Sequence, residues 1–137
     1  AVQRLESLFD DGKYTEIDVP KVVIDPLKFR DQKKYIDRLK DAVRKTTRRD
    51  AIIVGEGTMG GLKAVAAVFD FSFMGGSMGM AVGEGIVTAA RRAVATRSAL
   101  IVFPASGGAR MQEGALSLMQ MPRTIIAANE DKAAGLP

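Results

Sequence analysis

The sequence contains neither cysteine nor histidine. Without cysteine, the chain can form no disulfide bond and no thiolate zinc site. Without histidine, it can build no Ser-His or Cys-His nucleophile and no imidazole metal ligand. Any chemistry must therefore use backbone donors, carboxylates, lysine or arginine, a partner chain, or groups of the substrate itself.

Long apolar runs are also missing. Glycines and charges interrupt every apolar stretch before the ~20 residues that a membrane span requires. Arg4, Glu6 and Asp10 break the hydrophobic region that a signal peptide would need. We therefore expect no membrane association, and the absence of cysteine fits a cytoplasmic location.

Charge of either sign is not concentrated. The chain has 20 basic and 16 acidic residues, which gives a net charge of +4. The two signs are mixed along the sequence, so the balance does not argue for nucleic-acid binding. A small basic excess is equally natural around a substrate that carries phosphate.

The first fifty residues show a mostly helical pattern. Apolar spacing predicts helices over 1–9 and 31–46, a short strand over 14–19 and a connector over 21–29. The second helix has one apolar face, made of Tyr35, Ile36, Leu39 and Val43. Its other face is dense in charge, which is typical of a solvated surface.

The glycine-rich run 55–61 matches the dinucleotide-binding pattern G-x-G-x-x-G letter for letter. That fingerprint requires a helix to begin at the last glycine. Here Gly60 and Gly61 lead into a strand-like segment instead. We therefore reject a cofactor role for the run and predict a strand bend and a hairpin turn.

Residues 51–137 alternate strands and helices, which indicates an α/β fold. We expect strands at 51–54, 62–71 and 100–103, the last of them buried, with a helix over 78–94. A second helix should begin near Ala109, and Pro122 should kink or end it before a further helical stretch over 125–132. The apolar side of that second helix should consist of Met111, Ala115, Leu118 and Met119. A further strand is expected where the sequence stops, so we expect a fragment of a longer protein.

Two glycine turns, Gly75-Gly76-Ser77 and Ser106-Gly107-Gly108, each separate a strand from the next helix. Backbone N–H groups at such positions are unpaired and can bind a phosphate or a developing oxyanion. We expect the two turns to lie side by side at one sheet edge. The alternative is that these glycines serve only steric needs.

The residues around the second turn have alternative roles. With no histidine to activate it, Ser106 is expected to cap the following helix instead of acting as a nucleophile. Arg110 opposes the helix dipole at this position, which indicates a role beyond local stability. An ion pair involving Arg110 or Glu113 is the alternative.

Three segments, 27–35, 71–79 and 106–121, closely resemble the carboxyltransferase β subunits of bacterial acetyl-CoA carboxylases. The run from Ser106 to Gly114 also resembles the β subunits of propionyl-CoA-type carboxylases. The resemblance implies a crotonase-like (ClpP/crotonase) α/β fold of repeated β-β-α units, incomplete here. It makes 1–50 an N-terminal helical region and 51–137 the first part of the core.

By the same resemblance, the chain takes part in carboxyl transfer from carboxybiotin, held on biotin carboxyl carrier protein, to acetyl-CoA, giving malonyl-CoA. The implied oxyanion donors are the amides of Gly107 and Gly108, joined by Gly75 and Gly76. Cofactor contacts are implied for Ser77, Ser106 and Arg110. The CoA phosphates would meet basic side chains, with Arg44, Lys45, Arg48 and Arg49 as candidates.

The family also implies partners: a carboxyltransferase α subunit in an α2β2 assembly, and biotin carboxylase in the wider complex. Its four-cysteine zinc ribbon has no counterpart in this sequence, so no metal is expected in this segment. Two other functions stay open. One is a module that binds RNA or a phosphorylated ligand without catalysis, and the other is a crotonase-type hydrolase in which Glu113 activates water.

Overall fold

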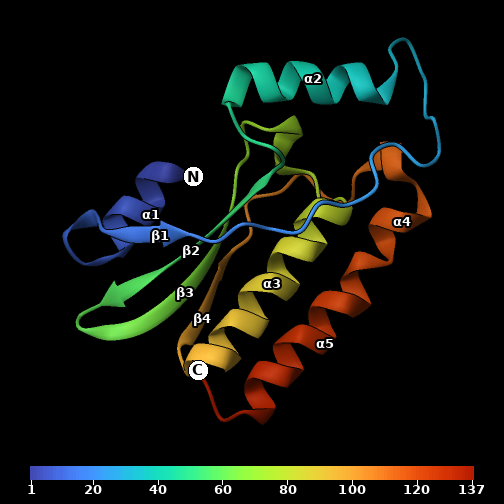
Figure 1. Cartoon of the computed structure of the whole chain (residues 1–137). Coiled ribbons are helices and arrows are strands. Elements are labelled where there is room, and N and C mark those ends of the chain that lie inside the picture. The colour runs from blue at the N-terminus through green and yellow to red at the C-terminus, as the bar shows by residue number, and fades with distance from the viewer.

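The computed structural model describes all residues, 1–137, and is built around a four-stranded sheet in the order β1-β2-β3-β4 (Figure 1). The strands are β1 (Tyr14–Glu16), β2 (Ile52–Met59), β3 (Leu62–Phe69) and β4 (Ala99–Phe103). Strand β2 pairs antiparallel with both β1 and β3, whereas β4 pairs parallel to β3. The predicted α/β class is confirmed. Strand β1 lies before residue 51 and still joins the same sheet. The proposed division of the chain at residue 51 stays a prediction.

Helices cover both faces of this sheet. They are α1 (Val2–Leu8), α2 (Tyr35–Thr46), α3 (Met80–Thr96), α4 (Ala115–Leu118) and α5 (Gln120–Ala133). Helix α3 packs on one face and α1 on the other, while α5 lies along α3. Helix α2 lies across the end of the sheet where β3 and β4 finish (Figure 1).

Alternation along β2 and β3 divides the core between the two faces, as expected for side chains that point to opposite sides of a strand. Ile52, Val65 and Phe69 face α3, in a cluster with Val82 and Ile86. The residues between them face α1 in a second cluster, which contains Leu5, Phe9, Ile53, Ala64, Ala66 and Val68. Both faces of the sheet are therefore buried, which explains the nearly continuous apolar run of β3.

The glycine-rich run forms a hairpin, so the predicted hairpin turn is confirmed, and no helix begins at its last glycine. Gly60 and Gly61 make the turn between β2 and β3 with φ values of +57° and +79°, which favour glycine. The Asp10 carboxylate accepts the N–H groups of Gly60 at 2.7 Å and Gly61 at 2.9 Å. The turn is thereby fastened to the chain segment that follows α1.

Two predicted elements differ in the structure. The helix expected from residue 31 begins at Tyr35, because Asp31 accepts the Lys33 N–H at 2.9 Å and holds a turn there. The strand over 100–103 was expected to be buried, and this was wrong. It lies at the edge of the sheet, and Val102 is 37% exposed.

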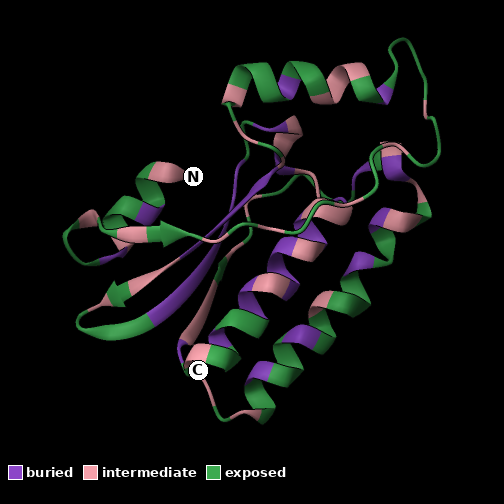
Figure 2. Ribbon diagram, in the orientation of Figure 1, coloured by how far each residue is buried: buried purple, intermediate pink, exposed green.

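The apolar side predicted for the second helix is also wrong. Met111, Leu118 and Met119 are 64%, 55% and 60% exposed, whereas polar Glu113, Ser117 and Gln120 are buried. The segment from the 3-10 turn to α5 carries six exposed apolar side chains, which we call the apolar ridge: Met111, Leu118, Met119, Met121, Ile125 and Ile126. Figure 2 shows the exposed outer side of α5.

The helix also starts later than predicted. A single 3-10 turn (Met111–Glu113) comes first, and Gly114 breaks it with φ 53° and ψ −136°. Helix α5 then begins at Gln120, which places Pro122 in its first turn, where a missing N–H costs no hydrogen bond. The predicted break near Pro122 is thus confirmed as a new helix start. None of the helices is long and apolar enough to cross a membrane.

The hairpin anchor predicts a pH effect on stability. The N–H groups of Gly61 and Gly60 lower the pKa of Asp10, so its stabilising effect is present above the unfolded pKa of ~3.9 and is lost as pH falls. We expect Asp10→Asn to be less stable at pH 7 and to lose less stability between pH 7 and pH 3. Urea unfolding at both pH values measures this.

Asp11→Asn is the matched control, because the Asp11 carboxylate has only an exposed ion pair with Lys13 at 3.5 Å. Its pH dependence should follow that of the unmodified chain. Parallel curves for Asp10→Asn and the unmodified chain would contradict the anchoring role.

Candidate functional site

The two glycine turns lie side by side, as the sequence predicts. They follow β3 and β4, whose parallel pairing brings their carboxyl ends to one sheet edge. Between the turns, the Met78 N–H donates to the Gly108 carbonyl at 2.8 Å and the Arg110 N–H to the Met78 carbonyl at 2.9 Å. The Gly107 N–H also donates to the Gly75 carbonyl at 2.9 Å. The turns therefore form one hydrogen-bonded unit.

Gly76 permits this close approach. A Cβ atom at this position would lie 2.1 Å from the Ala105 carbonyl oxygen, far inside van der Waals contact, and φ is +65°. By contrast, a Cβ at Gly107 would meet only the Gly75 oxygen, at 3.5 Å. The close backbone approach therefore requires glycine at position 76, whereas Gly75 and Gly108 are favoured by their positive φ values of +65° and +120°.

Three of the four predicted amide donors are already bonded within the chain. The Gly76 N–H donates to the Phe73 carbonyl at 2.9 Å, and the Gly107 N–H to Gly75 as described. The Gly108 N–H donates to the Ser106 hydroxyl at 3.0 Å. Ser106 thus closes its own turn, so the prediction that it caps a helix is wrong.

The amides of Gly75 and Ala109 have no hydrogen-bond partner in the chain. Both residues line one open cleft of about 570 Å³. Gly75 was predicted as a donor, whereas Ala109 was missed. Ala109 differs from its neighbours only because the paired turns leave its N–H unused, and no local sequence signal indicates this.

The facing wall of the cleft carries charge. It includes Lys33, Arg38 and Asp41, and the remaining lining is mainly apolar or glycine. Lys33 pairs with Asp41, and Arg38 pairs with Asp31 at 2.7 Å. The Arg38 bond lowers the pKa of Asp31, and the Lys33 bond lowers that of Asp41. Both carboxylates are thus held charged beside the two cations.

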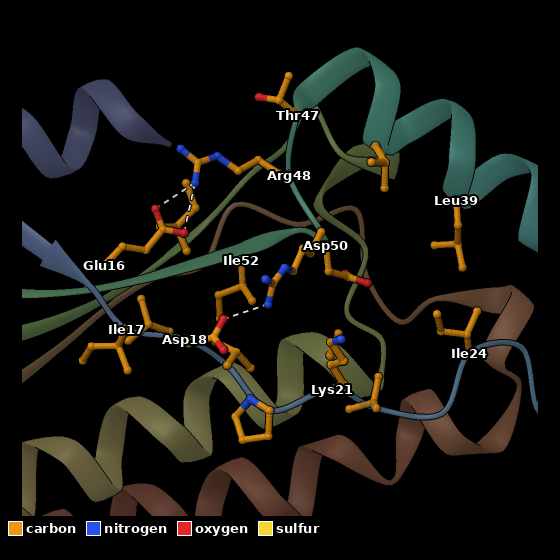
Figure 3. Close-up of a pocket in the computed structure, with 18 of the residues that line it drawn as sticks. Glu16, Ile17, Asp18, Lys21, Ile24, Leu39, Thr47, Arg48, Asp50 and Ile52 are labelled. Atoms are coloured by element: carbon orange, nitrogen blue, oxygen red, sulfur yellow. Dashed lines mark hydrogen bonds and ion pairs between the residues drawn. The ribbon is translucent and has the colours of Figure 1, made fainter.

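The basic residues named from sequence for phosphate contact lie outside this cleft. Arg48 pairs with Glu16 at 2.9 Å, and Arg49 with Asp18 at 2.7 Å. Both line a separate pocket of about 980 Å³ between α2 and the connector, with Ile17, Ile24 and Leu39 among its apolar residues (Figure 3). Arg44 also lines that pocket.

Arg110 lies behind the turns and is 0% exposed. Its Nη2 and Nη1 donate to the Asp50 carboxylate at 2.6 and 2.9 Å, and its Nε donates to the Ser77 hydroxyl at 3.1 Å. The Nη2 group also donates to the Ser77 carbonyl at 2.8 Å, and Nη1 to the Tyr35 hydroxyl at 3.1 Å. The predicted cofactor contact of Arg110 stays a prediction, and this geometry favours a positioning role.

Glu113 completes the buried group. Its carboxylate accepts the Tyr35 hydroxyl at 2.7 Å and the Met80 N–H at 2.6 Å, and it lies 3.5 Å from the Arg110 Nη1. A Cβ at Gly79 would come within 2.6 Å of this carboxylate. Arg110 and Glu113 therefore form ion pairs, which was the alternative considered for these two residues.

The charges of this group are fixed by their surroundings. Burial alone lowers the pKa of Arg110, but the hydrogen bonds and charge of Asp50 outweigh burial and raise it above the ordinary value. Burial raises the pKa of Tyr35, and the bond to Glu113 adds to this rise. Arg110 is therefore charged and Tyr35 neutral throughout the physiological range.

Metal ligands are not grouped anywhere in the chain: no three Asp or Glu side chains lie in a position to share an ion. The cleft therefore offers backbone amides, two cations, the Asp41 carboxylate and apolar surface. Such a set suits an anionic ligand, or an oxygen that becomes negative during a reaction.

Comparison with known proteins gives a family match over nearly the whole chain. Residues 7–136 match the carboxyl transferase domain. The acetyl-coenzyme A carboxylase carboxyl transferase subunit beta of Allorhizobium ampelinum is 61% identical over 137 residues. The same subunit of Rhizobium rhizogenes is 58% identical. Each match covers 100% of this chain and 45% of the relative, so the chain spans less than half of their length.

Solved structures share the fold. Transcarboxylase 12S, with methylmalonyl-coenzyme A bound, superposes with a TM-score of 0.67 and 30% identity over 91% of this chain and 22% of that one. A Pseudomonas malonate decarboxylase hetero-dimer gives a TM-score of 0.68 over 96% of this chain and 47% of that one, at 22% identity. These neighbours are crotonase-like, and the present chain is an incomplete version of that α/β fold.

The contact between the turns predicts unequal effects of two similar substitutions. Gly76→Ala should lower the free energy of unfolding by more than the ~1–2 kcal/mol that left-handed strain costs, because its Cβ also meets the Ala105 oxygen. Gly107→Ala should change it by less than ~0.5 kcal/mol. Urea unfolding compares them, and equal losses would contradict the close approach described here.

Proposed function

The chain belongs to the carboxyl transferase domain family, and from this membership we propose that it forms part of a carboxyltransferase β subunit. The proposed reaction moves a carboxyl group to acetyl-CoA and gives malonyl-CoA, the first committed step of fatty acid synthesis. The similarity to acetyl-coenzyme A carboxylase β subunits over the whole chain supports this substrate. The proposed location is the cytoplasm.

The free amides of Gly75 and Ala109 are the observation that carries this proposal. When the methyl group of an acyl thioester loses a proton, its carbonyl oxygen becomes an enolate oxyanion. Preorganised N–H donors stabilise such an oxygen without reorganisation during the reaction. Both residues line one cleft, and neither amide is used elsewhere. We therefore assign the donor role to this pair.

The other predicted glycines then have a supporting role. Gly76, Gly107 and Gly108 use their amides to shape and join the turns. Ser106 closes the second turn, and Ser77 lines the cleft while it accepts from Arg110. We propose that Ser77, which lines the cleft, contacts the ligand. We also propose that the other turn residues hold the two amide donors in place.

Lys33 and Arg38 are the cations that we propose for the anionic part of acyl-CoA. They line the same cleft as the free amides. Arg48 and Arg49 line another pocket. All four cations have carboxylate partners, so ion pairing does not distinguish them. Proximity to the donors therefore favours Lys33 and Arg38 over the basic residues suggested by the sequence.

Carboxybiotin on a carrier protein would supply the carboxyl group. The residues of this chain do not form a complete carboxybiotin site. The cleft holds one pair of free amides, and we assign that pair to the thioester oxygen. We therefore propose that donors for the biotin side come from a carboxyltransferase α subunit in an α2β2 assembly. Biotin carboxyl carrier protein and biotin carboxylase are the further proposed partners.

The two other functions lack a supporting observation. A hydrolase would need Glu113 to face a water molecule, but this carboxylate is 4% exposed and is held by Tyr35 and Met80. A nucleic-acid module would need free cations on α2 and the loop after it. There, Arg48 and Arg49 are paired with acidic side chains, Arg44 lies 3.8 Å from Asp41, and Lys45 is the one candidate without an ion pair.

Replacing Ala109 with lactic acid tests the donor role, because an ester oxygen then replaces the N–H. The ester also weakens the Gly108 carbonyl that accepts from Met78, so kcat is measured per folded, assembled complex. In the complete two-subunit enzyme, kcat for malonyl-CoA formation should fall about 10²–10³-fold, as for loss of one oxyanion donor. Lactic acid at Ala105 is the control, since that amide is also unpaired but does not line the cleft. Equal rates for the two esters would refute the assignment.

Arg38→Gln tests the cationic wall. The KM for acetyl-CoA should rise about fivefold, equivalent to roughly 1 kcal/mol, while kcat stays near its starting value. Arg49→Gln is the control, because Arg49 has a similar ion pair of 2.7 Å away from the cleft. Steady-state kinetics at low and high salt measure the KM of each variant. An equal change in KM for Arg38→Gln and Arg49→Gln would contradict the role of Arg38.

A further inference from the structure

Tyr35 joins the two walls of the cleft. It is the first residue of α2, and it is 1% exposed. The same helix carries Arg38 and Asp41, which line the charged wall. The Tyr35 hydroxyl donates to Glu113 at 2.7 Å and accepts from the Arg110 Nη1 at 3.1 Å. One side chain thus reaches from the charged wall to the group behind the amides.

Both partners of this hydroxyl are attached to the amide turns. Arg110 directly follows Ala109, and its Nη2 holds the Ser77 carbonyl at 2.8 Å. Glu113 accepts the Met80 N–H at 2.6 Å, just after the first turn. A shift of either partner would therefore move the backbone that carries the free amides.

Other contacts hold α2 weakly. Besides Tyr35, its only buried residue is Ala42. Two residues of its predicted apolar face, Ile36 and Val43, are 39% and 41% exposed. Leu39 is only partly buried against the core. The polar attachment at Tyr35 therefore contributes much of what fixes the helix at this end.

We propose that the Tyr35 hydroxyl is a positioning group that fixes the charged wall of the cleft against the amides of Gly75 and Ala109. This inference rests on the proposed function. A phenol suits the position because it donates to a carboxylate and accepts from a guanidinium at the same time. Phenylalanine would keep the ring but leave two buried charged groups each short of a partner.

Tyr35→Phe in the complete two-subunit enzyme tests this. We expect kcat for malonyl-CoA formation to fall at least about tenfold, because the variant loses hydrogen bonds to two charged groups, Glu113 and Arg110. The KM for acetyl-CoA should rise as well, since the charged wall moves too. A structural role alone would lower the melting temperature and leave kcat per assembled complex unchanged.

Tyr14→Phe is the matched control, because these are the two tyrosines of the chain. The Tyr14 ring stacks on Phe9 with centroids 5.9 Å apart, away from the cleft. Its kcat and KM should match those of the unmodified enzyme. If Tyr35→Phe keeps kcat within twofold while the unmodified enzyme is active, the inference is overturned. An inactive unmodified complex would instead overturn the proposed function.

Asp50→Asn is a second variant, which perturbs Arg110 from its other side. Asp50 accepts two hydrogen bonds from Arg110, and asparagine keeps its shape and one acceptor oxygen. Asparagine leaves the buried guanidinium without a charged partner, so a fall in kcat per assembled complex at least as large as in Tyr35→Phe is expected. An unchanged kcat in this variant would overturn the proposed coupling.

Discussion

The buried guanidinium of Arg110 is the interaction on which the site depends. It ties together α2, the loop before β2 and both glycine turns through Tyr35, Asp50 and Ser77. Burying a charge is costly unless it is paired and hydrogen-bonded, and all three of its nitrogens have partners here. Removal of one partner of a buried ion pair typically costs ~3–5 kcal/mol. The arrangement therefore strongly favours one placement of these segments.

The cleft follows from that placement and from the parallel pairing of β3 with β4. Parallel strands end at the same edge, so the turns that follow them become neighbours. Glycine at position 76 lets the two backbones touch, and most of their amides are then used to hold the turns together. Two amides remain, and their availability is a consequence of how the others pair. The reactive feature of this chain is thus a property of its backbone.

Local pattern predicted the features that depend on nearby residues. The strands on either side of the Gly60-Gly61 hairpin, the hairpin itself and the long helix after Gly79 are all governed by local spacing and turn chemistry. The failures concern distant contacts. Periodicity placed Met111 and Leu118 inside because it assumes that a chain buries its own apolar residues. No local signal joins Tyr35 or Asp50 to Arg110, which lies 75 and 60 residues away from them.

The apolar ridge makes this chain selectively sensitive to oxidants. The seven methionines of the chain carry all of its sulfur, because it has no cysteine. Three of them, Met111, Met119 and Met121, belong to the apolar ridge and are 64%, 60% and 49% exposed. Peroxide would convert such thioethers to polar sulfoxides, a change that reductase enzymes can reverse. Because Met111 also lines the cleft, the same chemistry would alter the ridge and the mouth of the site together.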